Sequence, residues 1–89
     1  MLTPVYTNHF EKDLKLMLRR SKDVEKIKAV IVALAEQRQL PANLRDHVLT
    51  GNFKARRECH IEPDWLLVYH IDAERIIFER TGTHADLFG

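Results

Sequence analysis

The chain has 89 residues, 45% hydrophobic and 30% charged, with a formal net charge of +1 at pH 7. This composition is typical of a single small globular domain over residues 1–89 and excludes a disordered chain. No apolar run approaches the roughly 18 residues of a membrane span, no signal peptide is visible, and the lone Cys59 excludes an intramolecular disulfide. We therefore expect a soluble cytoplasmic protein with no membrane partner, in which Cys59 is a buried small hydrophobic residue.

The N-terminal segment predicts a strand and then a helix. Residues 2–6 form a short strand candidate, and Pro4 is typical of an edge strand or a strand start because it cannot donate to a ladder. Thr7 or Asn8 can cap the helix, since a short polar side chain there accepts a hydrogen bond from the first turn. The apolar positions of this helix follow helical spacing: Phe10, Leu14, Met17 and Leu18.

A second helix has the clearest helical period of the chain. Ser21 or Asp23 can cap it, and we expect it to end at Pro41. Its apolar positions are Val24, Ile27, Val30, Ile31 and Leu34. Because only a few residues separate the two helices, we expect them to form an antiparallel hairpin.

Basic residues gather in two places. Lys12, Lys15 and Arg19 lie on a different side of the first helix from its apolar positions. The second group comprises Lys54, Arg56 and Arg57. Each group is either an ordinary solvated surface or a phosphate-binding surface, and a net charge of +1 does not decide between them.

Beyond the second helix the pattern changes to a loop and strands. We expect a loop from Pro41 to Asn52 that contains His47. In the strand that follows, polar residues alternate with apolar ones, which places His60 on the polar face beside Arg56. The apolar positions of that strand are Phe53, Ala55, Cys59 and Ile61.

Two further strands complete an antiparallel meander. The segment from Glu62 to Trp65 is a turn with proline at its favoured second position. A strongly apolar strand runs from Trp65 to Ile71, and a third strand runs from Arg75 to Thr81, followed by Gly82 and a short tail. One strand, a helical hairpin and a meander together predict an α+β domain.

Several residues of the C-terminal half can do acid–base chemistry. His47, His60 and His84 carry imidazoles, which titrate near neutral pH, and imidazoles close to arginine are what phosphodiester cleavage by proton transfer requires. Asp64 would lie at the same rim of the sheet as His60, where it could orient or charge-balance an imidazolium, or act as a base. The ordinary alternatives are scattered surface histidines and an aspartate that only stabilises its turn.

The neighbouring residues allow two interpretations each. Trp65 is either part of the core or a platform for stacking a base, and Arg80 is an ordinary surface residue unless histidines lie beside it. His9 and His70 are interpreted as structural or incidental. No histidine, cysteine or carboxylate pair has the short spacing of a metal-binding motif, so we expect neither a metal site nor a cofactor.

Four features of the chain resemble a known family. They are H-x-L-x-G (residues 47–51), Arg57, the run HIEPDW (residues 60–65) and the run ERTGTHADLF (residues 79–88). H-x-L-x-G is shared widely, whereas HIEPDW together with RTGTHADLF is much more specific. Together with the order of predicted elements, they resemble the YafQ branch of the RelE/ParE toxin superfamily over nearly the whole chain.

This resemblance implies a fold, an activity and partners. The fold would be the RelE-like microbial RNase fold, and the protein would be a bacterial type II toxin that cleaves mRNA in the ribosomal A site. Its partners would be the ribosome, mRNA and a silencing antitoxin of the DinJ/RelB kind. A heterotetramer with that antitoxin is one assembly that the pair could form.

The resemblance also implies roles for residues. It places catalysis on His47, His60, Asp64 and His84, with Arg80 supporting the phosphate. Trp65 and Phe88 would shape the site or stack on bases. The distribution of charge, and not the resemblance, adds the basic residues that would contact RNA if they form a phosphate-binding surface: Lys12, Lys15, Arg19, Lys54 and Arg56.

The physical requirements of the reaction agree with these residue types. Attack by the neighbouring 2′-OH needs a base, an acid for the departing 5′-oxygen and positive charge at the phosphorane, and it needs no metal. We expect His60 or Asp64 to be the base and His84 the acid.

Two other functions remain open at this point. A non-catalytic toxin of the ParE type, which poisons DNA gyrase, would share the fold but would not need the set His47, His60, Asp64 and His84. A passive RNA-binding module would rest on the basic helix face alone. The presence of all four residues favours the nuclease.

Overall fold

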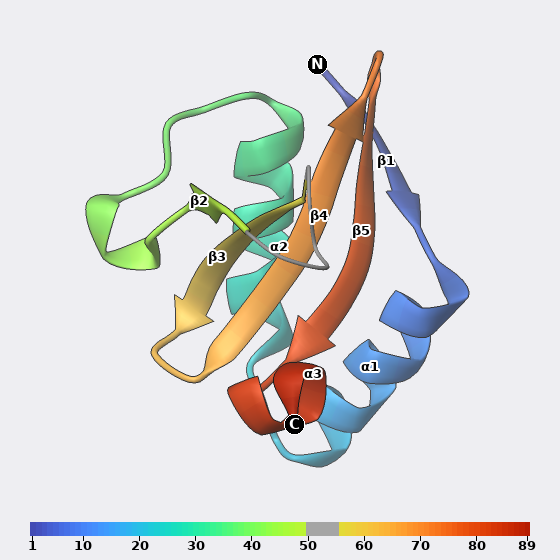
Figure 1. Ribbon diagram of the computed structural model, residues 1–89, viewed down its shortest axis with the longest axis vertical. Helices are drawn as coiled ribbons and strands as arrows, with labels where there is room; N and C mark the ends of the chain where they lie inside the picture. Colours follow the sequence, from blue (N-terminus) through green and yellow to red (C-terminus); the bar gives the residue numbers. More distant parts are fainter. Residues whose placement is uncertain (50–55) are drawn as a thin grey trace.

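The computed structural model describes residues 1–49 and 56–89 (Figure 1). Its elements are β1 (Thr3–Tyr6), α1 (Asn8–Arg19), α2 (Val24–Ala35), η1 (Ala42–Leu44), β2 (His47–Val48), β3 (Arg57–Glu62), β4 (Trp65–Asp72), β5 (Arg75–Gly82) and α3 (His84–Phe88). The described strands form a five-stranded sheet in the order β1-β5-β4-β3-β2. All neighbours are antiparallel except β1, which runs parallel to β5. The expected α+β class, with β1 and its Pro4 at an edge, is confirmed.

The two long helices begin at side-chain caps. The hydroxyl of Thr7 accepts the backbone N–H of Phe10 at 3.0 Å, and the carboxylate of Asp23 accepts the N–H of Glu25 at 2.9 Å. Each bond satisfies one N–H of a first turn that has no partner within its helix. Thr7 and Asp23 are therefore the caps, from the two candidates expected for each helix. Figure 1 shows the helices running in roughly opposite directions.

The second helix ends earlier than expected. α2 stops at Ala35, well before Pro41, so the prediction that proline ends it is wrong. Gln37 adopts a left-handed conformation with φ of 58°, and the N–H of Arg38 donates back to the carbonyl of Ala33 at 2.9 Å. This Schellman arrangement closes the helix without glycine, so a proline is not needed to stop it.

The core lies between the helices and one face of the sheet. Figure 1 shows α2 behind β3 and β4, and α1 beside the lower end of β5. Cys59 is buried, as expected, and burial raises the pKa of its thiol to about 12. The other buried residues of this cluster include Phe10, Met17, Ile27, Ile61, Trp65, Leu67, Tyr69, Ile76 and Phe78.

The segment around His47 is more regular than the expected loop. It contains the short turn η1 and the two-residue strand β2, in which His47 pairs with Glu58 of β3. The strand that contains Cys59 and His60 was expected to begin near Phe53, and that position lies outside the described residues. Within them β3 begins at Arg57.

The C-terminal segment is a helix, not the expected short tail. In α3 the Thr83 hydroxyl accepts the N–H of Asp86 at 3.1 Å, while the Asp86 carboxylate accepts the N–H of Thr83 at 3.0 Å. This reciprocal capping box fixes where the helix begins. With helices of 12 residues at most, the described part of the chain has none that could cross a membrane.

Candidate active site on the open face of the sheet

The face of the sheet turned away from α1 and α2 carries a row of polar side chains; we call it the open face. His47 of β2 pairs with Glu58 of β3, Glu58 pairs with Val68 of β4, and Val68 pairs with Arg80 of β5. Residues directly opposite one another on neighbouring strands point to the same face. Four strands therefore place His47, Glu58 and Arg80 in one row.

A second row lies beside the first, toward the β3–β4 turn. It consists of His60, Leu66 and Gly82, which are paired across β3, β4 and β5. Since His84 follows Gly82 by two residues, this row leads directly to α3. Leu66 is fully buried although it lies outside the main core cluster, so it provides an apolar floor for the open face.

Glu58 is the centre of this arrangement. It is only 5% exposed. Its Oε1 lies 3.2 Å from Nε2 of His60, and its Oε2 lies 3.8 Å from Nε2 of His47. The sequence reading missed Glu58, because a glutamate at an alternating position of a strand looks like an ordinary solvated residue. The available signal was its place two residues before His60, on the same face.

The third imidazole is held by Asp64. The Asp64 carboxylate accepts the backbone N–H of His84 at 2.9 Å, and it lies 2.6 Å from Nδ1 of the same residue. These two bonds, the backbone one first, lower the pKa of Asp64. The structure therefore joins Asp64 to His84, whereas the shared rim suggested His60 as its partner. The turn before Trp65 and the start of α3 are thereby linked.

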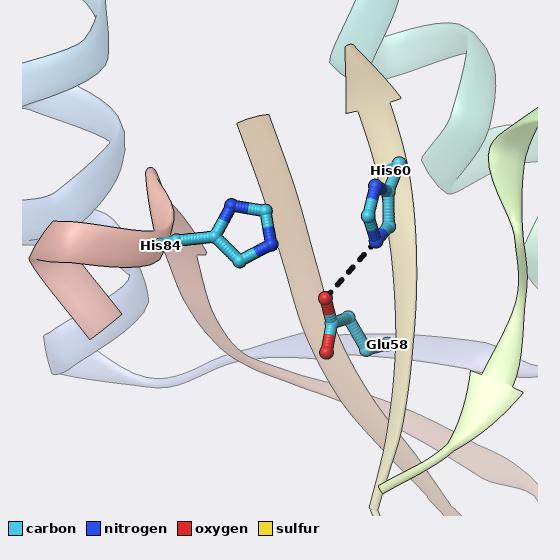
Figure 2. A group of neighbouring side chains, drawn as sticks. All are labelled: Glu58, His60 and His84. Carbon is cyan, nitrogen blue, oxygen red and sulfur yellow. Dashed lines mark ion pairs between the residues drawn. The ribbon is translucent and has the colours of Figure 1, made fainter. Parts of the chain in front are cut away.

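The imidazoles meet around the buried carboxylate. Figure 2 shows one ring nitrogen of His84 turned toward Glu58 and His60. The ring centroids of His60 and His84 are 5.7 Å apart at 70°, and those of His47 and His60 are 6.3 Å apart. Donor atoms of Glu58, His60 and His84 lie within 4.8 Å of one another. The structure thus brings together His47, His60, His84 and Asp64, the set singled out from the sequence.

Hydrogen bonds behind the site hold the segment that carries His47. The Tyr69 hydroxyl donates to Asp46 at 2.6 Å, and Arg57 donates to the same oxygen at 3.2 Å. Burial, and then Asp46, raise the pKa of Tyr69, so it remains a hydrogen-bond donor. The Nδ1 of His47 lies 2.5 Å from the carbonyl of Arg45, which can only accept, so Nδ1 carries a proton. Sequence reasoning missed this support.

Arg80 lies in the first row, but its guanidinium is turned toward α1. Its Nε and Nη2 donate to the Asp13 carboxylate at 2.7 and 3.2 Å. The same carboxylate accepts the N–H of Thr81 at 3.2 Å and so caps the edge of β5 beyond its pairing with β1. The described structure shows no contact between Arg80 and the imidazoles.

The two aromatic residues of the predicted site differ in their exposure. Trp65 is 0% exposed, and its indole N–H donates to the Thr81 hydroxyl at 2.9 Å. Its rings belong to the core, which is the first of the two interpretations that the sequence allowed, and they offer no exposed face to a base. Phe88, at the end of α3, is 44% exposed and can offer a ring face to a base.

The basic residues predicted to contact RNA differ in whether a carboxylate pairs with them. Arg56 is paired with Glu79, which also binds Nδ1 of His70 at 2.8 Å, and Lys54 lies outside the described residues. The three basic residues of α1 are exposed, and no carboxylate of the described ranges pairs with them: Lys12, Lys15 and Arg19. Their geometry fits both a solvated surface and a phosphate-binding surface.

Comparison with known proteins agrees with this fold and identifies a family. Residues 2–89 match the family described as the bacterial toxin of the type II toxin–antitoxin system, YafQ. The mRNA interferase toxin YafQ of Escherichia coli K12 is 45% identical over 85 residues, covering 94% of this chain and 92% of that protein. The toxin in the crystal structure of the E. coli DinJ–YafQ complex is 42% identical, with a TM-score of 0.91 and full coverage of both chains.

A metal-bound toxin from Helicobacter pylori has a similar crystal structure. It is 38% identical, with a TM-score of 0.93, and the match covers 99% of this chain and 100% of that chain. The family model and the relatives agree with the resemblance found in the motifs. The chain belongs to the YafQ family of bacterial type II toxins.

Proposed function

We propose that this protein is an mRNA interferase that cleaves mRNA on translating ribosomes. The observation that carries the proposal is the group of three imidazoles, His47, His60 and His84, around the buried carboxylate of Glu58. Its E. coli relative, 45% identical, is named an mRNA interferase toxin. A ParE-like toxin that only binds gyrase would not need such a group.

The geometry supports a division of roles between the two carboxylate–imidazole pairs. Asp64 accepts two bonds from His84 and has a lowered pKa, which makes Asp64 a poor base. Of the two candidate bases expected from the sequence, we therefore choose His60. His84 carries a proton on Nδ1 toward Asp64, and its other nitrogen faces the site, where the doubly protonated ring can act as the acid (Figure 2).

The reaction then needs no group from outside the protein and the RNA. His60 takes the proton of the 2′-OH, and the 2′-oxygen attacks phosphorus. The bond from phosphorus to the 5′-oxygen breaks, and His84 gives its proton to that oxygen. The products are a 2′,3′-cyclic phosphate and a 5′-hydroxyl. Cationic His47, or Arg80 if its pair with Asp13 opens, would stabilise the charge of the phosphorane.

A divalent ion is the competing possibility at the same place. The donor atoms of Glu58, His60 and His84 lie within 4.8 Å of one another, and imidazole with carboxylate suits transition metals. A related H. pylori toxin is metal-bound. An ion there would engage the inward nitrogen of His84, which the acid–base route needs, and would compete with His60 for the Glu58 carboxylate. We propose that cleavage is metal-independent and that such an ion would inhibit it.

The partner follows from the same family. The E. coli relative forms a complex with DinJ. We propose that an antitoxin of the DinJ/RelB kind neutralises this chain, in a heterodimer or heterotetramer, and that both act in the bacterial cytoplasm where ribosomes translate. Toxicity of the protein expressed alone, relieved by co-expression of the antitoxin, would support this.

One experiment separates the candidate functions. Purified protein is incubated with ribosomes that carry a defined mRNA, and the RNA ends are mapped by primer extension. New ends inside codons, seen only with ribosomes present, support the interferase. Intact mRNA together with inhibition of gyrase supercoiling would contradict it and favour the ParE-like alternative. Binding to RNA without either effect would favour a passive RNA-binding module.

A further inference from the structure

We infer that Glu58 is a positioning residue, which fixes the orientation and tautomer of the imidazole of His60; this rests on the proposed nuclease function. The Glu58 carboxylate is 5% exposed, and its Oε1 is 3.2 Å from Nε2 of His60 (Figure 2). His60 lies two residues further along the same strand, so β3 sets both side chains on the open face.

Among the residues that the structure describes, the carboxylate of Glu58 is buried beside imidazoles and not beside a permanent cation. Removing an ionised carboxylate from water costs several kcal/mol unless charged or hydrogen-bonding partners compensate. Its cross-strand neighbour on β4 is Val68, which offers no hydrogen bond. Within the described residues, the side chains that pair with it are two imidazoles and no lysine or arginine. An ion pair that served folding alone would be better made with a permanent cation, so the pairing with imidazoles points to the site.

The contact has a chemical consequence for His60. A neutral imidazole carries one N–H, and a carboxylate 3.2 Å from Nε2 favours the tautomer that turns N–H, not a lone pair, toward it. Nδ1 then keeps its lone pair and is the nitrogen that can take the 2′-OH proton. When His60 becomes cationic, the adjacent carboxylate stabilises the new charge. The aspartate of the Ser-His-Asp triad acts on its histidine in the same way.

The other oxygen of Glu58 faces His47. Nδ1 of His47 already donates to the carbonyl of Arg45, and Nε2 lies 3.8 Å from Oε2 of Glu58. A second proton on His47, at Nε2, would therefore meet an acceptor charge. Glu58 thus faces two imidazoles in different ways: it holds His60 in the tautomer of a base, and it lies further from Nε2 of His47. The shorter contact is with His60, and that contact is the one to test.

The test is a double-mutant cycle in single-turnover cleavage on ribosomes, with Glu58→Gln, His60→Ala and the double variant. Glutamine keeps the shape of the side chain and removes its charge. We expect Glu58→Gln to lower the cleavage rate at saturation by about 10²-fold, within the range for a positioned acid or base, and to leave the half-saturating ribosome concentration unchanged. In the His60→Ala background the same change should have little further effect, because Glu58 acts through His60.

A matched control is available on the same strand. Glu62 is also partly buried, and its carboxylate is paired with Lys22 and Lys26 at 2.9 and 3.0 Å. Glu62→Gln should cleave at close to the wild-type rate. Glu58→Asp keeps the charge but withdraws it from His60, so its rate should fall between those of the wild type and Glu58→Gln. Thermal unfolding of each variant shows whether it is folded.

Two outcomes would overturn the inference while leaving the proposed function intact. One is wild-type cleavage by Glu58→Gln, and the other is a multiplicative loss in the double variant. An independent readout needs no ribosome: long-range ¹H–¹⁵N spectra of the free protein, at a pH where His60 is neutral, should show its proton on Nε2 in the wild type and a mixture of the two tautomers in Glu58→Gln. A wild-type proton on Nδ1 would refute the inference. No cleavage by the wild type would instead refute the proposed function.

Discussion

The Asp64 carboxylate accepts the backbone N–H of His84 at 2.9 Å and lies 2.6 Å from the Nδ1 of the same residue, 20 positions further along the chain. The first bond ties the first residue of α3 to the turn between β3 and β4, and the second fixes which nitrogen of His84 carries its proton toward the aspartate. The turn between β3 and β4 therefore sets the position of the proposed acid, which must be doubly protonated to carry a proton on its other nitrogen. The proton that His84 can deliver is the one on its other nitrogen.

His84→Ala should reduce single-turnover cleavage by about 10²–10⁴-fold, because it removes the proposed acid. His84 is exposed, so the melting temperature should change little. Asp64→Asn, which keeps an acceptor but removes the charge, should give a smaller loss. Rapid-quench assays on ribosomes measure both rates. Full activity of His84→Ala would remove this residue from the reaction.

Trp65→Phe should lower stability and leave ribosome binding unchanged. The fully buried indole donates to the Thr81 hydroxyl, and losing that bond costs about 1–3 kcal/mol. Urea unfolding measures the loss. Phe88→Leu is the comparison: its ring is exposed, so it should weaken binding to the programmed ribosome with little effect on stability. The opposite pattern would return Trp65 to a base-stacking role.

Changing Lys12, Lys15 and Arg19 to glutamate should weaken ribosome binding and flatten its dependence on salt, because fewer counterions are released. These side chains are exposed on α1, and the described residues offer them no carboxylate partner. Lys28→Glu, on α2, is the matched control. Filter binding over a range of salt concentrations gives the slopes. Equal slopes for the triple variant and the control would show that this face is only solvated.

The contact between α3 and the end of α1 should weaken at acid pH, because Asp86 then becomes protonated. The Arg20 guanidinium, and then the N–H of Thr83, hold the pKa of Asp86 at about 2, below its ordinary value of 3.8. A carboxyl group whose pKa is lower in the folded state than in the unfolded state stabilises the fold at pH values above its ordinary pKa. That contribution is therefore present above pH 3.8 and is lost as the pH falls toward about 2.

Acid titration of backbone amide signals of α3 measures this dependence. Asp86→Asn should remove this dependence on pH. Asp72→Asn should not, because Asp72 lies at the end of β4 that is remote from α3. Since the Arg20–Asp86 pair ties α3 to the end of α1, Asp86→Asn should also lower the cleavage rate by displacing His84. An unchanged acid transition in Asp86→Asn would show that another group controls α3.

The sequence predicted the parts of this molecule that depend on local pattern. Alternation placed His60 on the polar face and Cys59 in the core, and helical periods placed Phe10 and Ile27 there too. Motifs identified the imidazoles, although only the pairing of β2 with β3 explains why His47 reaches the others.

Other features could not be predicted because they depend on tertiary contacts. Glu58 has the spacing of a solvated residue, and only the arrival of imidazoles from β2 and β3 makes its burial acceptable. The end of α2 at Ala35 uses Gln37 in a left-handed conformation that glycine would normally signal. α3 was signalled by Thr83 and Asp86 at capping-box spacing, but it is too short to show a helical period.

If protein side chains alone carry out the cleavage, the chemistry of the RNA ends will show it. Single-turnover cleavage is run with intact ribosomes, with and without EDTA, and the fragments are analysed by mass spectrometry. We expect the rate to be the same with and without EDTA, and the fragments to carry a 2′,3′-cyclic phosphate or 3′-phosphate and a 5′-hydroxyl. A 5′-phosphate with a free 3′-hydroxyl, or loss of cleavage in EDTA that added metal restores, would contradict this expectation.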